Sequence, residues 1–185
     1  MKKLLSMMLV AAMVLSLAAC GSKSADKAED VAPLEVLETV WETYAEDEMF
    51  AAMGGDMNNM VDNAPGTYDV KDAEGLDSVL GFPQASVALI DDAASLVHMM
   101  NANTFTAGAF HVTEVDEVEM LAADIEDNIM NRQWMCGFPE TLIIVQVGDA
   151  TLVSAFGNGE LIENFKTKLL AAYEGAEVLT EESLM

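Results

Sequence analysis

The tripeptide Gly-Phe-Pro occurs twice in the chain, at residues 81–83 and 137–139. Each copy follows a stretch with helical periodicity, which ends near Leu80 in the first case and near Arg132 in the second. Two apolar segments and a further helical stretch follow each copy. This recurring order indicates a duplicated helix-strand-strand unit. We therefore predict an α+β domain, with an antiparallel sheet of about four strands and helices on one face. The paired segments are 96–102 with 105–112 and 142–147 with 150–156.

Apolar residues at spacings of three and four predict the helices, and capping residues predict their ends. The first helix is expected from Pro33, which suits a first turn, to about Met49. A short helix covers 73–80, and a longer one follows Thr113 and extends to Arg132. Asn158 caps the last helix and Gly175 stops it, so we expect the tail, residues 177–185, to fray.

Turn residues predict the connections. Gly148-Asp149 lies between two β-rich runs and predicts a two-residue hairpin turn. Residues 54–68 are rich in Gly, Asn, Asp and Pro, which predicts a loop with Met57, Met60 and Val61 packed beneath it. For residues 84–95 the sequence does not decide between a strand and the start of a helix, because a short apolar run has no decisive period.

The amino-terminal residues are typical of an export signal. Lys2 and Lys3 precede an uncharged apolar run, and Leu17-Ala18-Ala19-Cys20 resembles the lipobox of bacterial lipoproteins. We expect residues 1–19 to be a signal peptide and Cys20 to be lipidated, since two acyl chains hold a protein durably on a membrane. The alternative is an uncleaved signal anchor, because residues 4–22 are almost long enough to span a bilayer.

These features divide the chain into four parts. After the signal peptide, residues 20–32 form the lipidated cysteine and a flexible tether with a reach of roughly 20 Å. Residues 33–176 form a single α+β domain, and 177–185 form the tail. The expected location is the extracytoplasmic face of the cell membrane.

The charge of the chain is strongly negative. It has 8 basic and 32 acidic residues, a net charge of −24. Removal of residues 1–19 takes away Lys2 and Lys3 and no acidic residue, so the mature chain carries −26. Such a surface repels nucleic acid and attracts cations and basic peptides. Simple solubility at the cell surface is the other explanation.

Cys136 is the only thiol left once Cys20 carries lipid, so no disulfide is expected within the domain. The stretch Trp134-Met135-Cys136-Gly137-Phe138-Pro139 invites comparison with the thioredoxin active site, but the second cysteine is missing. We therefore interpret Cys136 as a structural cysteine, and a catalytic thiol is the alternative. Trp134 and Cys136 remain candidate ligand-binding residues.

His98 and His111 are the two histidines. A hairpin turning at Thr104-Phe105 would place them opposite each other, where two imidazoles could share a metal ion. Zinc would need further ligands that these segments do not offer, so packed or surface histidines are the alternative and no metal is predicted. His98 and His111 are kept as candidate ligand-binding residues.

Other catalytic and metal-binding patterns are missing from the sequence. Asp56, Asn58 and Asp62 suggest a calcium loop, but Met60 occupies the third ligand position. No nucleophile elbow, phosphate-binding glycine loop or zinc-protease helix is present. We therefore expect a non-enzymatic protein without a cofactor.

Methionines cluster in the sequence at Met49, Met53, Met57 and Met60 and again at Met99-Met100. Methionine side chains are flexible and polarisable, so this group could line an adaptable peptide-binding groove. Packing in the core is the alternative explanation.

Several stretches resemble a group of small acidic lipoproteins of Gram-positive bacteria, some of which are labelled bacteriocin transport accessory proteins. The resemblance covers residues 34–173 and implies a membrane-anchored accessory role, without site residues to carry over. The stretches are the 17–20 lipobox, Trp41-Glu42-Thr43-Tyr44, residues 98–106 and residues 131–139.

Three hypotheses follow for function. The first is a non-enzymatic binding or accessory lipoprotein, for a cationic peptide or beside a membrane transporter. The second is a metal-dependent or thiol enzyme using His98, His111 or Cys136. The third is a module that binds another protein of the cell envelope.

Overall fold

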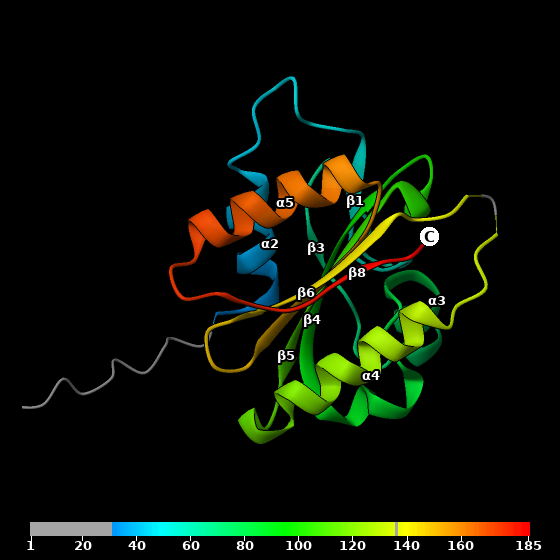
Figure 1. The fold of residues 1–185 in the computed structure, drawn as a ribbon, viewed down its shortest axis with the longest axis vertical. Helices are drawn as coiled ribbons and strands as arrows, with labels where there is room; N and C mark the ends of the chain where they lie inside the picture. Colours follow the sequence, from blue (N-terminus) through cyan, green and yellow to red (C-terminus); the bar gives the residue numbers. More distant parts are fainter. Residues whose placement is uncertain (1–30, 136) are drawn as a thin grey trace, which may run out of the picture.

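The computed structural model describes residues 31–135 and 137–185, and its centre is one antiparallel sheet of eight strands (Figure 1). The fold class is α+β, as predicted. The expected count of about four strands is wrong. It matches only the four apolar strands, because the other four are too short or too polar to show a period of two. The apolar strands are β4 (Ile90–His98), β5 (Phe105–Val112), β6 (Thr141–Val147) and β7 (Thr151–Gly157).

The strand order is β2-β1-β4-β5-β7-β6-β8, and β3 also pairs with β4. The two long hairpins, β4–β5 and β6–β7, therefore meet through β5 and β7 at the middle of the sheet. The additional strands are β1 (Ala52–Gly54), β2 (Val61–Asp62), β3 (Gly66–Thr67) and β8 (Glu177–Ser183).

Helices cover both faces of the sheet, which corrects the prediction of helices on one face (Figure 1). α2 (Pro33–Trp41) and α5 (Gly159–Ala172) pack on one face. α3 (Ala73–Leu80) and α4 (Val118–Met130) pack on the other. The physical reason is visible in β6, where Ile143 is buried in one core and Ile144 in the other. A strand that is apolar at successive positions needs cover on both sides.

The ends of α3 and the start of α5 follow local capping. α3 matches the predicted 73–80, with the Asp72 side chain accepting the Gly75 N–H at 2.9 Å and Gly81 in a left-handed conformation at its end. α4 ends at Met130, close to the predicted Arg132. The predicted start of α4 after Thr113 is wrong, because a 3-10 turn, η3 (Val115–Glu117), comes first and α4 begins at Val118 without a side-chain cap. α5 is capped by Asn158 as predicted.

The first helix is shorter than predicted and ends at Trp41 instead of about Met49. Tight i+3 turns replace it, with the Thr43 N–H bonded to Val40 O and the Tyr44 N–H to Trp41 O. These turns bring the Trp41 and Tyr44 rings to 4.8 Å from each other, and Phe50 packs against both. Burial of this aromatic cluster stabilises the turns, and the helix therefore ends although the apolar spacing continues.

Two connections differ in detail from the predictions. The hairpin at Gly148 is confirmed, but Val147 pairs with Thr151, so the loop has three residues instead of two. Gly148 has a positive φ of 64°. The open segment 84–95 becomes a 3-10 helix, η1 (Gln84–Leu89), followed by the start of β4 at Ile90.

The tail does not fray through its whole length, because residues 177–183 form β8 and pair with β6. The Thr180 hydroxyl donates to Glu126 of α4 at 2.8 Å, and Lys166 of α5 contacts Glu181 at 2.7 Å. Three of the seven residues of β8 are acidic and only Val178 and Leu179 are apolar, so a hydrophobic pattern gave no signal for this edge strand.

We predict that the β8 amides bonded to β6 exchange their hydrogens about 100-fold more slowly than unstructured amides. The reason is that a ladder hydrogen bond must open before exchange. Hydrogen exchange followed by mass spectrometry on the carboxy-terminal peptide measures this. Exchange at the unprotected rate over 177–183 would contradict the pairing.

Candidate functional site

The predicted site residues separate into two groups. Cys20 and Cys136 lie outside the residues that the structure describes. His98, His111 and Trp134 are described, and they do not converge on one site.

The facing arrangement of His98 and His111, in which they could have shared a metal ion, is not formed, because the two residues are not opposite each other. His111 pairs with Asp92 in the β4–β5 register, and His98 lies at the far end of β4, where it pairs with Ala52 of β1. The predicted turn at Thr104-Phe105 was misplaced, since β4 ends at His98 and the chain turns over 99–104. Within residues 31–135 and 137–185, no group of three or more His, Cys, Asp or Glu residues is arranged to hold a metal ion.

Each histidine has a local role. The His98 ring stacks on Phe50, with 5.4 Å between centroids and 18° between planes. Its Nδ1 accepts the N–H of Met100 at 3.2 Å and that of Asn101 at 3.4 Å, so it caps the turn after β4. His111 Nδ1 lies 2.5 Å from a carboxylate oxygen of Asp91.

The structure brings together the stretches 98–106 and 131–139, which are far apart in sequence. The Asn103 side-chain amide donates to Met135 O and to Gly137 O, each at 3.0 Å. Thr106 in turn donates to Ala102 O at 3.0 Å. Asn103 therefore ties the loop before β6 to the turn before β5 at one end of the sheet.

Trp134 packs in this loop. Its ring lies 5.2 Å from the ring of Phe156, and the Arg132 guanidinium lies 5.3 Å from the indole centroid. Arg132, the only arginine in the sequence, also donates to Ser78 O. Burial lowers the pKa of Arg132, and the nearby Asp77 carboxylate opposes that shift.

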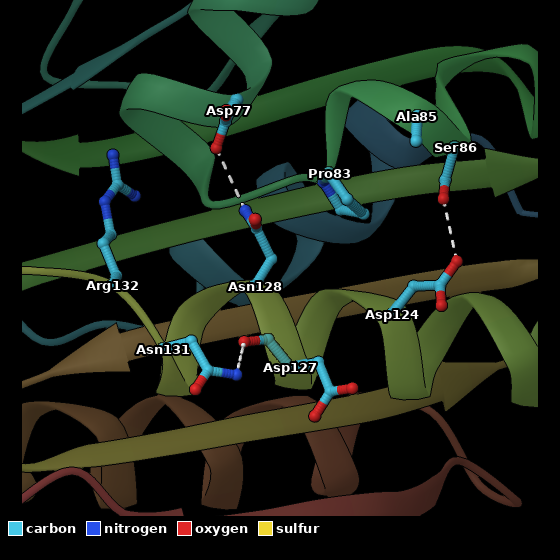
Figure 2. Close-up of a pocket in the computed structure, with 9 residues that line it drawn as sticks. All are labelled: Asp77, Pro83, Ala85, Ser86, Asp124, Asp127, Asn128, Asn131 and Arg132. Atoms are coloured by element: carbon cyan, nitrogen blue, oxygen red, sulfur yellow. Dashed lines mark hydrogen bonds between the residues drawn. The ribbon is translucent and has the colours of Figure 1, made fainter.

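An open groove of about 480 Å³ lies between α3 and η1 on one side and α4 on the other, and we call it the acidic groove (Figure 2). Asn128 bridges its two sides, donating to Asp77 at 3.0 Å and to Gly81 O at 2.9 Å. Ser86 donates to Asp124 at 2.8 Å. The groove is thus preformed by hydrogen bonds between its walls. Its lining is Asp77, Pro83, Ala85, Ser86, Asp124, Asp127, Asn128, Asn131 and Arg132.

A second depression of about 230 Å³ lies beside Trp134, and we call it the tryptophan hollow. Its lining combines Trp134 and Met135 with Ser78 and Val79 of α3 and with Asn103. It shares Arg132 with the acidic groove, so the two depressions are adjacent.

A third depression of about 90 Å³, the methionine hollow, is the most apolar in character. Met53, Met57 and Met60 line it together with Gly55, Asp56, Tyr68, Val79 and Val97. The predicted packing of Met57, Met60 and Val61 beneath the 54–68 segment is wrong, because Met57 is 77% exposed, Met60 54% and Val61 39%. That segment also contains β2 and β3, so it is not a plain loop.

Asp56 forms the polar base of the methionine hollow and is 4% exposed. Its carboxylate accepts the N–H groups of Asn58 at 2.7 Å, Asn59 at 3.1 Å and Asp69 at 3.2 Å. These hydrogen bonds hold the pKa of Asp56 below its usual range despite burial, and the bond from the Asn58 N–H has the largest effect. Backbone N–H groups thus already bind the Asp56 carboxylate, which the comparison with a calcium loop suggested as a metal ligand.

Three consecutive residues of α3 connect the depressions. Asp77 lines the acidic groove, Ser78 the tryptophan hollow, and Val79 both the tryptophan and the methionine hollows. The result is one continuous surface around α3 with an apolar end and an acidic end. The methionines and Trp134 stand out in the sequence, whereas Asp77, Ser78, Val79 and Asp124 do not, because only the fold places them beside each other.

Comparison of the chain with protein-family models, with curated proteins and with solved structures gives no match.

We predict that Asn103→Ala loosens the loop at 131–139 and lowers the free energy of unfolding by about 1 kcal/mol, since two side-chain hydrogen bonds at an exposed site are lost. Urea unfolding measures the free energy, and hydrogen exchange should become faster in that loop. The control is Gln133→Ala, which removes an exposed amide from the same loop. Equal effects of both substitutions would contradict the tie through Asn103.

We predict that Asp56 makes stability depend on pH in acid. Its folded pKa is lowered, so its contribution is present above the ordinary value of 3.8 and is lost as pH falls through the folded pKa. The difference in urea midpoint between the native chain and Asp56→Asn should therefore shrink below about pH 4. A difference that stays constant from neutral pH to pH 2.5 would contradict this assignment.

Proposed function

We propose that this chain is a non-enzymatic lipoprotein, anchored through Cys20 at the extracytoplasmic face of the cell membrane, which binds a cationic peptide segment around α3. The observation that carries the proposal is the continuity of the methionine hollow, the tryptophan hollow and the acidic groove. A peptide with apolar and basic side chains would meet matching chemistry along this surface.

The apolar end suits peptide recognition. Monomeric proteins seldom expose several large apolar side chains together without a binding role. Flexible thioether side chains adapt to different partners, as in helix-in-groove recognition. The exposed apolar residues that line these depressions are Met57 and Met60 in the methionine hollow and Met135 in the tryptophan hollow.

The acidic end supplies charge complementarity. Asp77, Asp124 and Asp127 line one groove, where ammonium or guanidinium groups of a peptide would be attracted. The net charge would also speed association with a basic partner through long-range steering.

Internal counter-ions are scarce in the described part of the chain. Residues 31–135 and 137–185 include four basic side chains: Lys71, Arg132, Lys166 and Lys168. Lys166 is held by Glu163 and Glu181, and Lys168 by Glu48 at 2.9 Å. Most carboxylates therefore face solvent without a basic neighbour, which supports a cationic partner from outside.

The membrane attachment rests on the leader and lipobox. Along the described residues, no helix combines the length and apolarity needed to cross a bilayer. The resemblance to acidic lipoproteins labelled bacteriocin transport accessory proteins supports an accessory role beside a membrane transporter that handles peptides. Separation of the two histidines weakens the alternative of a shared metal centre.

We predict that the mature chain binds a fluorescent amphipathic peptide of leucine and lysine, and that binding weakens at least tenfold as salt rises from about 50 to 500 mM. Fluorescence anisotropy measures the dissociation constant. The triple variant Asp77→Asn, Asp124→Asn, Asp127→Asn should bind at least tenfold more weakly than the native chain.

The matched control is Glu35→Gln, Glu38→Gln, Glu42→Gln, which removes the same charge from α2 and the turn after it, on the other face of the sheet. We expect this control to change affinity less than threefold. Equal weakening by the two triple variants would show nonspecific charge attraction and would contradict a peptide site around α3.

A further inference from the structure

The three methionines of the methionine hollow come from one hairpin. Met53 lies in β1, where it pairs with Asp62 of β2, and Gly54 pairs with Val61. Met57 and Met60 lie in the six-residue connection between the two strands. Gly55 has a φ of 81°, and a Cβ there would lie 2.1 Å from the carbonyl oxygen of Asn59. This close approach folds the connection back on itself and directs all three side chains to one depression.

The oxygen atoms near the hollow are poor metal ligands. The Asp56 carboxylate already accepts hydrogen bonds from Asn58, Asn59 and Asp69. Burial and the Asp72 and Asp56 charges raise the pKa of the Tyr68 phenol to about 12, so it stays protonated at neutral pH. The available donors are therefore the thioether sulfurs of Met53, Met57 and Met60.

Thioether sulfur is a soft, neutral ligand that selects Cu(I) over hard cations such as Mg²⁺ and Ca²⁺. Three neutral ligands suit a monovalent ion better than a divalent one, since no ligand charge offsets a second positive charge. Thioethers do not compete for protons in water, so such a site works across the whole physiological pH range. The net charge of the chain raises the local concentration of cations.

We propose that Met53, Met57 and Met60 form a binding site for a soft monovalent metal ion of the Cu(I) class. Met57 and Met60 are more than half exposed, so the ion enters directly from solvent and the side chains close on it without rearrangement of the sheet. Met53 is half-buried in β1 and anchors the site. This inference goes beyond peptide binding and does not rest on it.

The test uses Ag(I), a redox-inert probe of the same ligand preference, on the full mature chain with thiols blocked by N-ethylmaleimide. With ¹³C-labelled methionine methyl groups, the resonances of Met53, Met57 and Met60 should shift and saturate at one ion per chain. Isothermal titration should give the same stoichiometry. Parallel shifts of all exposed methionines, or no saturable shift, would overturn the site.

The variant Met53→Leu, Met57→Leu, Met60→Leu keeps side-chain volume and removes the sulfur atoms. It should bind Ag(I) at least tenfold more weakly, and unchanged binding would overturn the proposal. Met120→Leu with Met130→Leu, two exposed methionines on α4, is the control and should bind as the native chain does. Ag(I) binding is measured on the chain without any peptide, so its outcome does not depend on the peptide proposal.

Discussion

The pairing of β5 with β7 joins the two long hairpins into one sheet. Seven residue pairs extend from Phe105–Gly157 to His111–Thr151, and almost every side chain on both strands is buried. Because both faces of this pair are apolar, each face needs a cover of helices. α3 and α4 cover one face, and the acidic groove lies between them, so the site depends on the burial of the central strands.

Much of the local structure was predictable, and the errors have physical causes. Asp72, Gly81 and Asn158 act as caps through their own side chain or backbone freedom, so sequence shows α3 and α5 directly. The register of β4 with β5 was not predictable, because it depends on a turn of six residues, 99–104, which has no strong two-residue turn signal. β8 forms through edge pairing and through contacts of Thr180 and Glu181 with helices, which a hydrophobic pattern does not report.

The candidate site was predictable only in pieces. Met53, Met57, Met60 and Trp134 attract notice as residue types and line two of the depressions, whereas Met49, Met99 and Met100, which were expected in the same groove, line none of the three. The assembly of the site needs Asn103 to hold the loop before β6 and α3 to connect three depressions through successive residues. Such neighbours are distant in sequence and polar in character, so no periodicity connects them. The two histidines show the opposite case. His98 and His111 stand out in the sequence because histidine is rare in it, but in the structure each has a local role and they do not form a shared site.

The negative charge and the exposed methionines are physically connected. Exposed thioethers and Phe138 would promote self-association of a neutral protein, since burial of apolar surface between copies is favourable. Mutual repulsion between copies that each carry a net charge of −24 opposes this association. The same repulsion would exclude anionic proteins and nucleic acid from the apolar surface. A cationic partner is the class for which electrostatic attraction and apolar burial act in the same direction, and the arrangement around α3 places both contributions within one continuous surface.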